Sequence, residues 1–206
     1  MSKDNGATVN EDRGAGESSA PLALILPYRN RADGSETFPV IHPEAWIAPT
    51  AVVTGDVHIG ELASIWFGTV IRGDIESVRI GARTNIQDNS VIHVDSGGFN
   101  VEIGNDVTVW HAAKIHGCTI RDHALIGIGA ILLNGAEIGE GALVAAGSLV
   151  PPGKKIPPGV MAMGSPAKVI RELTADERKE VLEGADHYVE YSQNYRFGRT
   201  PGKRPE

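Results

Sequence analysis

The chain has 206 residues, of which 41% are hydrophobic and only 5% aromatic, with 25 glycines and 12 prolines. This length can bury the core of one or two domains, and small and β-branched aliphatic residues must supply it, which favours a fold rich in sheet and turns. The formal charge of −7, without basic runs interleaved with aromatic residues, argues against nucleic-acid or anionic-membrane partners. We therefore expect a small-molecule substrate or a protein partner.

We expect no targeting or membrane signal in the N-terminal segment. Residues 1–20 are polar with both signs of charge, and this composition predicts a disordered tail. The apolar stretch 22–26 is too short for a signal-peptide core, and no apolar run approaches the ~18 residues of a transmembrane helix. The single cysteine, Cys118, excludes an internal disulfide framework and fits a reducing compartment. We predict a soluble, cytoplasmic protein with no membrane partner.

After an extended lead-in over residues 21–50, an aliphatic residue recurs at a step of six. The step is interrupted by three extra residues before Ile80, by an insertion before Ile103 and by a slip of one residue before Ile120. A period of six is neither helical nor the alternation of a two-faced strand. Eighteen positions follow it: Ile47, Val53, Ile59, Ile65, Ile71, Ile80, Ile86, Ile92, Ile103, Val109, Ile115, Ile120, Ile126, Leu132, Ile138, Val144, Val150 and Ile156.

One short strand and one turn in every six residues stack into a parallel β-helix with three faces to a coil. Eighteen positions then make about six coils, so we predict an all-β solenoid as one domain over residues 21–168. The pattern resembles the hexapeptide-repeat, or isoleucine-patch, superfamily. That resemblance implies a left-handed parallel β-helix and a homotrimer.

After residue 168 the pattern changes to that of a helix. Thr174 and Glu177 have the spacing of a capping box, and the apolar residues that follow share one helical face. We predict a C-terminal α-helix and tail over 169–206, packed along the coil through a stripe of five residues: Val181, Leu182, Ala185, Tyr188 and Val189.

Three of the seven histidines have informative positions in the repeat. Counting the aliphatic positions in threes aligns the isoleucines that precede Arg72, His93 and His116 on one face, so these three residues form a column. Two imidazoles one strand spacing apart can share a metal ion. His111 follows Val109 by two residues and belongs to another face, from which it could reach His93 and His116 of a neighbour in a trimer.

Three imidazoles with an open fourth position are the pattern of a catalytic zinc site. Imidazoles that stack and hydrogen-bond at a trimer interface without a metal would have the same spacing. Spacing alone leaves both alternatives open.

Arg72-Gly73-Asp74, the segment 84–88, His93 and the segment 109–120 together resemble the γ-class carbonic anhydrases. The resemblance covers about residues 24–196 and implies a γ-class carbonic anhydrase-like lyase. Its reaction is the reversible hydration of carbon dioxide to bicarbonate by a metal-bound hydroxide at a trimer interface. The resemblance implies that His93 and His116 of one subunit and His111 of the next bind the metal.

The resemblance also implies roles for four candidate catalytic residues. Gln87 and Asn85 match residues that hydrogen-bond metal-bound water or bicarbonate, and Arg72 and Asp74 match an interface ion pair. Asn85, Gln87 and Asp88 could equally satisfy strand-edge and turn backbone groups, and we expect Asp88 to be structural. Zinc is the expected metal, while Fe²⁺ and Co²⁺ also accept three imidazoles.

The chain departs from the family pattern where the proton should leave. Ile75 stands where a carboxylate is expected, and the insertion 96–100 has none; Glu76 and Asp95 are the acids nearby. Two other classes of function therefore stay open. One is an acyl-CoA thioesterase or acyltransferase with a histidine general base, against which the third histidine argues. The other is a metal-bound scaffold protein with little activity.

Overall fold

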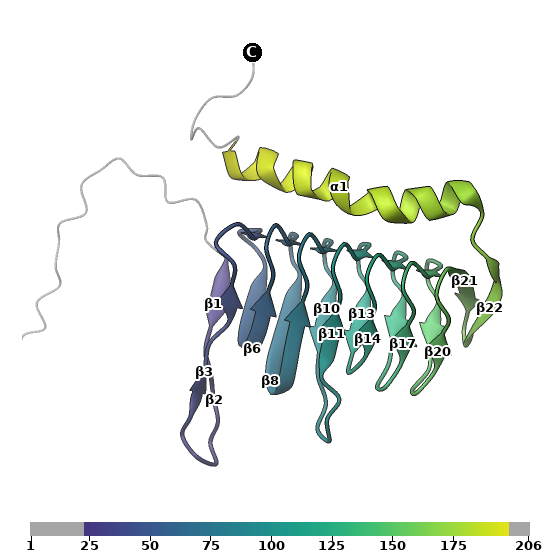
Figure 1. The fold of residues 1–206 in the computed structure, drawn as a ribbon. Helices are drawn as coiled ribbons and strands as arrows, with labels where there is room; N and C mark the ends of the chain where they lie inside the picture. Colours follow the sequence, from purple (N-terminus) through teal and green to yellow (C-terminus); the bar gives the residue numbers. More distant parts are fainter. Residues whose placement is uncertain (1–22, 198–206) are drawn as a thin grey trace, which may run out of the picture.

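A computed structural model describes residues 23–197, so the predicted tail 1–20 lies outside the described residues. The described chain is a parallel β-solenoid of about seven turns with one C-terminal helix (Figure 1). The predicted solenoid and C-terminal helix are thus confirmed. The predicted limits of the tail, the repeat domain and the C-terminal segment stay predictions.

Three faces, here named A, B and C in chain order, make up each turn. Face A contains β1 (Leu24–Leu26), the first halves of β6 (Val52–Ile59) and β8 (Val70–Ile80), β10 (Val91–His93), β13 (Lys114–His116), β16 (Ile131–Leu132) and β19 (Leu149–Val150). Face B contains β4 (Val40–Ile41), the second halves of β6 and β8, β11 (Val101–Ile103), β14 (Thr119–Ile120), β17 (Glu137–Ile138) and β20 (Lys155–Ile156). Face C contains β5 (Trp46–Ile47), β7 (Ser64–Ile65), β9 (Asn85–Ile86), β12 (Thr108–Val109), β15 (Leu125–Ile126), β18 (Leu143–Val144) and β21 (Val160–Gly164).

The eighteen predicted aliphatic positions fall into three columns of paired residues, one for each face. All of them are buried except Ile47, which is half-buried. The lead-in adds a turn that the count of six missed, because Ile25 pairs with Val53 and Ile41 with Ile59. A hairpin of β2 (Tyr28–Arg29) and β3 (Glu36–Thr37) separates these strands and hides the six-residue step.

The corners between faces A, B and C require close backbone approach. A Cβ added at Gly81 would lie 2.5 Å from the carbonyl carbon and oxygen of Gly104 in the next turn. Only glycine allows turns to stack this closely at that corner. The stacking fixes the register of the strands, and with it the alignment of every outward-facing column.

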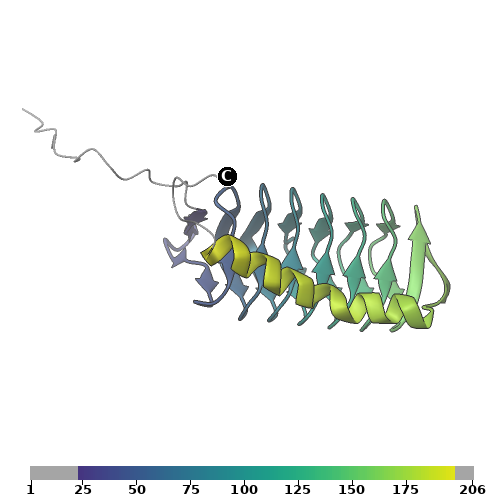
Figure 2. The ribbon, with the colours of Figure 1, turned by 90° about the horizontal axis from the view of Figure 1, so that it is seen from above.

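Helix α1 (Ala175–Phe197) lies over face C and runs back from the last turn to the first (Figures 1 and 2). Val181 and Ala185 are buried and Tyr188 and Val189 half-buried, as the predicted stripe requires. Leu182 is 53% exposed, so its place in the stripe was wrong. One residue along a helix turns the side chain by about 100°, and with Val181 facing the coil Leu182 faces away.

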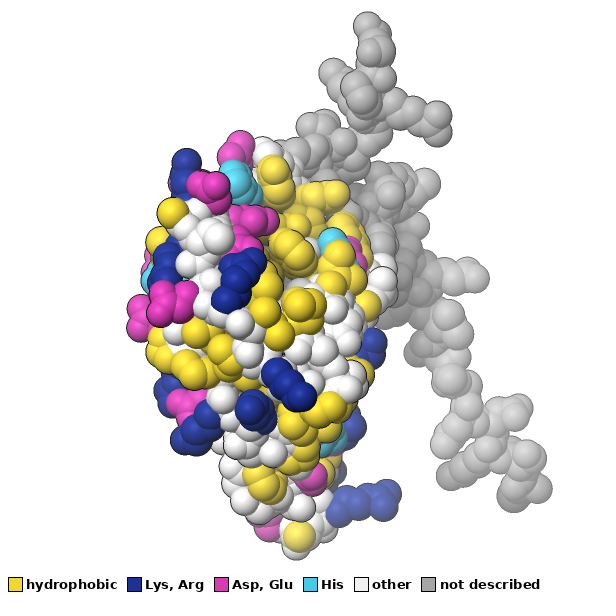
Figure 3. Space-filling view, turned by 90° about the vertical axis from the view of Figure 1, so that its right-hand side faces the viewer, with side chains coloured by type: hydrophobic (Ala, Val, Ile, Leu, Met, Phe, Trp, Pro, Cys, Tyr) yellow, Lys and Arg dark blue, Asp and Glu magenta, His cyan; other side chains and the backbone are white. Residues whose placement is uncertain are grey.

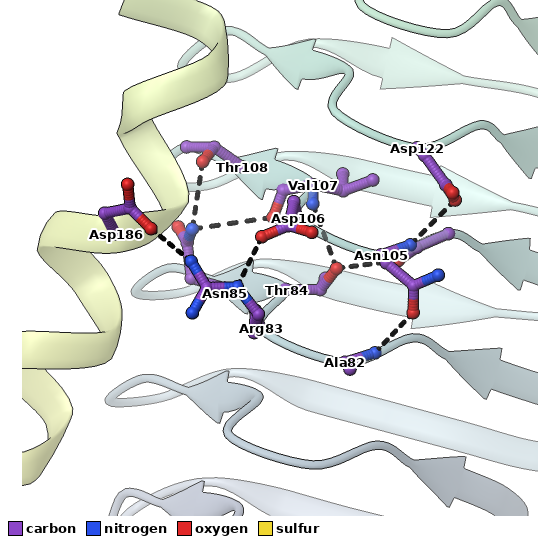
Figure 4. A network of polar contacts seen from close by, with 11 residues as sticks. Ala82, Arg83, Thr84, Asn85, Asn105, Asp106, Val107, Thr108, Asp122 and Asp186 are labelled. Atoms are coloured by element: carbon purple, nitrogen blue, oxygen red, sulfur yellow. Dashed lines mark hydrogen bonds and ion pairs between the residues drawn. The ribbon is translucent and has the colours of Figure 1, made fainter.

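Ring contacts and one ion pair fix the helix on the solenoid. Tyr188 packs edge-on against Trp66 at 5.4 Å between ring centroids, and Tyr195 lies 5.3 Å from Trp46. Asp186 accepts a hydrogen bond from Arg83 at a corner of the solenoid (Figure 4). The helix therefore stays in register with the turns that it covers.

The helix begins with the predicted capping box. Thr174 Oγ1 accepts a hydrogen bond from the backbone N–H of Glu177 at 3.2 Å, and Glu177 Oε2 accepts one from the N–H of Thr174 at 2.8 Å. The hydrogen bond from Arg171, and then that from Thr174, lower the pKa of Glu177 to about 2. The bonds that Glu177 accepts from Arg171 and Thr174 therefore stabilise the helix end most strongly while Glu177 is ionised.

We expect the protection factors of amide hydrogens in the first turn of α1, which compare the observed exchange rate with the intrinsic rate at the same pH, to fall as the pH falls from 4.5, the ordinary pKa of a glutamate, toward about 2. A carboxyl with a lowered pKa in the folded state contributes stability above its unfolded pKa and loses it as the pH falls. Glu177→Gln, which has no proton to gain, should remove this pH dependence. Equal pH dependence in both proteins would contradict the assignment.

The last turn ends in the antiparallel pair of β21 and β22 (Ala167–Glu172). Figure 3 looks at this end of the solenoid, where hydrophobic side chains lie among basic and acidic ones. Val169 and Ile170 of β22 are among its exposed apolar residues. In the part of the chain that the structure describes, no helix is both long and apolar enough to cross a membrane.

Candidate metal centre

The predicted column lies at the corner between faces A and B. Arg72, His93 and His116 are Cα partners on β8, β10 and β13. The side chain of His93 is only 18% exposed, and its Nδ1 lies 3.1 Å from Nε2 of His116. Parallel pairing thus brings two imidazoles from neighbouring turns together, with ring centroids 5.1 Å apart and ring planes inclined at 56°.

The remote ring nitrogens of both histidines contact oxygen atoms. Nε2 of His93 lies 3.1 Å from Oδ1 of Asp74, and Nδ1 of His116 lies 2.5 Å from Oδ1 of Asn134. Arg72 donates a hydrogen bond to the other oxygen of Asp74. Burial would raise the pKa of Asp74, but the hydrogen bonds from Arg72 and His93 outweigh it and lower that pKa. Asp74 is therefore an ionised acceptor.

These contacts determine the tautomers of the two rings. Asn134 donates its Nδ2–H to Oδ2 of Asp95 at 2.8 Å, so its carbonyl oxygen must face His116 and accept the Nδ1–H. His93 likewise donates its Nε2–H to the Asp74 carboxylate. In its neutral form an imidazole has one donor and one acceptor nitrogen. In that form, with their remote nitrogens donating, the nitrogens that face each other across 3.1 Å both present lone pairs. A cation between them relieves the repulsion.

The spacing of these lone pairs fits a metal ion. Two ligands at Zn–N distances of ~2.0–2.1 Å and a tetrahedral angle lie about 3.4 Å apart, within a few tenths of an ångström of the observed 3.1 Å. Oxygen partners on the remote nitrogens are the usual companions of metal-binding histidines. The donor set therefore suits a divalent metal that prefers imidazole.

His111 lies at a different corner, between faces C and A. Its Nδ1 is 2.9 Å from Oδ2 of Asp88, and its side chain is 47% exposed. The next residue, Ala112, has a φ of 59°, and its N–H donates to the carbonyl of Asp88 at 2.8 Å. This left-handed corner projects the ring outward with Nε2 available. Asp88, expected to be structural, therefore also orients a histidine.

Gln87 and Asn85 lie on the same side of the solenoid as His111, and not beside His93 and His116. Gln87 donates its Nε2–H to Oδ1 of Asn85 at 3.0 Å, and Asn85 donates its Nδ2–H to Oγ1 of Thr108 at 2.9 Å (Figure 4 shows this second contact). Both amide side chains are buried. Oε1 of Gln87 is also buried and has no hydrogen-bond partner within the described residues. This amide oxygen is therefore an unsatisfied acceptor.

A pocket of about 640 Å³ lies between α1 and this corner. Gln87 and His111 line it together with the apolar side chains of Trp110, Leu125 and Ile128. On the helix side Tyr188 lines it too, with a pKa raised by burial and then by the charge of Asp88. The pocket thus combines an apolar wall with the side chains of Gln87 and His111.

The seven predicted site residues therefore divide into two groups. Four lie at the corner between faces A and B: Arg72, Asp74, His93 and His116. Three lie on face C or at its corner with face A: Asn85, Gln87 and His111. Within residues 23–197, no three His, Cys, Asp or Glu side chains of one chain form a group that could hold a metal ion.

Sequence reasoning missed Asn134 and did not connect Asp95 to the column. Asn134 lies two residues after Leu132, one turn beyond His116 on face A. Continuing the column by one turn leads to Leu133, the residue before Asn134, so the column alone does not indicate Asn134. The pKa of Asp95 is lowered by the hydrogen bonds from Asn134 and from the backbone of Ser96.

Comparison with known proteins gives matches that cover most of the chain. The profile of the bacterial transferase hexapeptide family (six repeats) matches residues 38–73 and 117–152. A protein named carbonic anhydrase from Geobacillus kaustophilus is 50% identical over 173 residues, covering 84% of this chain and 91% of its own. Gamma carbonic anhydrase 1, mitochondrial, from Arabidopsis thaliana is 43% identical over 160 residues, 75% of this chain, which matches 58% of the length of that relative.

A crystal structure from Bacillus cereus, named as an acetyltransferase, superposes with a TM-score of 0.81 at 48% identity, covering 86% of this chain and 99% of the other. The seven-turn solenoid and its helix match the left-handed β-helix of the hexapeptide family. Identity of this extent to carbonic anhydrases implies a metal cofactor. The chain belongs to the γ-class carbonic anhydrase family of hexapeptide-repeat proteins, enzymes of the lyase class.

Proposed function

We propose that the chain forms a cytoplasmic homotrimer that hydrates carbon dioxide reversibly at three metal sites, one at each subunit interface. His93 and His116 of one subunit and His111 of the next would bind the metal, with zinc as the first choice and Fe²⁺ or Co²⁺ as alternatives. The substrate is small and needs no nucleic-acid or membrane partner.

One observation carries the proposal: two imidazoles face each other across 3.1 Å with their remote nitrogens bonded to oxygens. The arrangement leaves two lone pairs for one cation. His111, oriented in the same way by Asp88, is at another corner of the solenoid. A second copy of the chain is the simplest source of the third ligand, because a cyclic trimer brings different surfaces of identical subunits together.

When bound, a divalent metal with three imidazole ligands lowers the pKa of coordinated water to ~7 and so makes hydroxide available at neutral pH. The chain's own residues would orient the reactants. Gln87 Oε1, held by the bond from Gln87 Nε2 to Asn85, can accept a hydrogen bond from a hydroxyl group and so orient water or bicarbonate. Trp110, Leu125 and Ile128 would give carbon dioxide an apolar wall.

Metal content and carbon dioxide hydration, measured on one anaerobically purified sample, test this function. We expect about one divalent metal per subunit, as a three-histidine site holds one ion, and hydration that disappears when a chelator removes the metal. Protein that stays metal-free after incubation with zinc, cobalt and ferrous iron would contradict the proposal.

We expect export of the proton to limit turnover. Ile75 is 55% exposed where a carboxylate would serve, and Glu76 already accepts a hydrogen bond from the backbone of Gly98 at 3.0 Å. Imidazole buffer should therefore raise kcat with little effect on kcat/KM, because a diffusible base replaces the missing proton acceptor. Ile75→Glu should raise kcat in dilute buffer. High turnover that is independent of buffer would contradict this expectation.

Acyl-group chemistry is the second candidate, favoured by the name of the Bacillus cereus structure. A thioesterase or acyltransferase would use one histidine as a general base and would not need metal. Hydrolysis or transfer of an acyl-CoA thioester by metal-depleted protein would support it. A metal-bound scaffold would show stoichiometric metal and neither activity.

A further inference from the structure

We propose that the insertion between β10 and β11 positions the metal ligand His116, through a relay from Asp95 to Asn134 to the imidazole. The insertion has no part in the six-residue repeat, and Figure 1 shows it projecting from the corner opposite α1. Asp95 and Asn134 are positioning residues in this account. The inference rests on the proposed function in that it takes His116 to be a metal ligand.

The relay is a directed chain of hydrogen bonds. A carboxylate can only accept, so Asp95 Oδ2 draws the NH₂ group of Asn134 toward itself at 2.8 Å. The amide oxygen is thereby turned to His116 Nδ1 at 2.5 Å. The ring must place its proton on Nδ1, which leaves the lone pair of Nε2 pointing at His93. Without Asp95, the Asn134 amide could rotate by 180° and offer its NH₂ to the ring.

The loop itself is held in the position that this relay needs. The backbone N–H of Asp95 donates to the carbonyl of Phe99 at 3.1 Å, and the Asp95 side chain accepts from the N–H of Ser96 at 2.8 Å. Both bonds close the loop on itself. Glu76 of β8 accepts from the N–H of Gly98 at 3.0 Å and ties the loop to the solenoid.

Gly117, directly after His116, leaves the space in which the relay and the loop meet. A Cβ there would lie 2.8 Å from Phe99 Cβ and 3.0 Å from Asn134 Oδ1, and the residue has a φ of 53°. Neither the left-handed backbone nor the contact with Phe99 suits a side chain. Gly117 lies where the repeat is one residue short, between Ile115 and Ile120. Its lack of a side chain allows Phe99 of the insertion to lie close to Asn134.

Removing a residue that hydrogen-bonds a metal-binding histidine typically weakens metal binding by ~10–100-fold. Asn134→Leu keeps the branching at Cγ but removes both hydrogen bonds, so we expect the Kd for Co²⁺ to rise by that factor. Asp95→Asn, which only frees the amide to rotate, should cost less. The charge-swapped double variant Asn134→Asp with Asp95→Asn rebuilds the chain of bonds and should recover the wild-type affinity or exceed it.

Asn105→Leu is the matched control. Like Asn134, Asn105 accepts a hydrogen bond from the neighbouring turn, in this case from the backbone N–H of Ala82 at 2.8 Å (Figure 4). It follows β11, at the corner between faces B and C, whereas the histidine column lies at the corner between faces A and B. This variant should leave the Kd for Co²⁺ unchanged. The visible absorption spectrum of bound Co²⁺ should change in Asn134→Leu and not in Asn105→Leu.

The decisive readout uses the metal-free full-length protein with ¹⁵N-labelled histidine. Nitrogen–proton correlation spectra should show His116 protonated on Nδ1 in the wild type and in the swapped variant, and a mixture of tautomers in Asn134→Leu. An unchanged tautomer and an unchanged Kd for Co²⁺ in Asn134→Leu would overturn the relay.

This design separates the two proposals. If the wild type binds no metal, the proposed function fails, and the tautomer of His116 still decides whether the relay exists. If the wild type binds Co²⁺ and the swapped double variant binds it no better than Asn134→Leu, the function stands and the relay fails.

Discussion

His116→Ala is expected to lose metal binding and carbon dioxide hydration together. The substitution leaves Nδ1 of His93 without its partner at 3.1 Å, so each site would retain two imidazoles instead of three. The loss of metal affinity should exceed the ~10–100-fold that removal of an outer partner costs, and the metal content after gel filtration should approach zero. Elemental analysis and a hydration assay on the same preparation measure both effects.

His58→Ala is the matched control for this substitution. His58 lies on face B near Asp56, with Nε2 3.6 Å from that carboxylate and the side chain 49% exposed. It has no contact with the column, so metal content and activity should match the wild type. Retained stoichiometric metal in His116→Ala would show that His93 and His116 do not share an ion.

Ile138→Ala should destabilise the protein by ~2–5 kcal/mol, because truncation of a fully buried isoleucine leaves a cavity in a closely packed core. Ile138 is completely buried in the face B column, between Ile120 and Ile156. Chemical denaturation should show the loss as a lower midpoint. Ile170→Ala makes the same change at a side chain that is 50% exposed and should alter stability by less than ~0.5 kcal/mol.

If Ile138→Ala lost less stability than the control Ile170→Ala, the assignment of the aliphatic columns to the core would be contradicted. The site and the core are separable in this comparison, because Ile138 contacts neither histidine group. Metal content per folded subunit should therefore stay at the wild-type value in both variants.

The repeat could be predicted because each coil obeys the same packing constraint. A buried aliphatic residue at every sixth position fixes strand, face and register together, so the partners of Ile92 follow from counting. The first turn could not be counted, since the hairpin of β2 and β3 breaks the step between Ile25 and Ile41. The last turn ends in Ala162, which is too small to be recognised as a core aliphatic.

The site could be predicted only where it follows the register. Face counting aligned His93 with His116 and assigned His111 to another corner, but it says nothing of the side-chain bonds that orient each ring. Asn134 reaches His116 from the next turn, and Asp88 reaches His111 from the previous one. Such contacts depend on rotamers and corner conformation, which a repeat pattern does not encode.

Metal content of mixed trimers tests the shared site most directly. A His93→Ala subunit still offers His111, and a His111→Ala subunit still offers His93 and His116, so neither homotrimer has an intact site. In any cyclic trimer that contains both kinds of subunit, one of the three interfaces joins an intact pair to an intact His111.

Co-refolding the two variants and isolating the mixed trimers should therefore restore up to about a third of the wild-type metal per trimer, with carbon dioxide hydration in proportion. If all three histidines served one subunit, every chain in every mixture would carry a broken site. Mixed trimers that bind no more metal than the two parent variants would contradict a site shared between subunits.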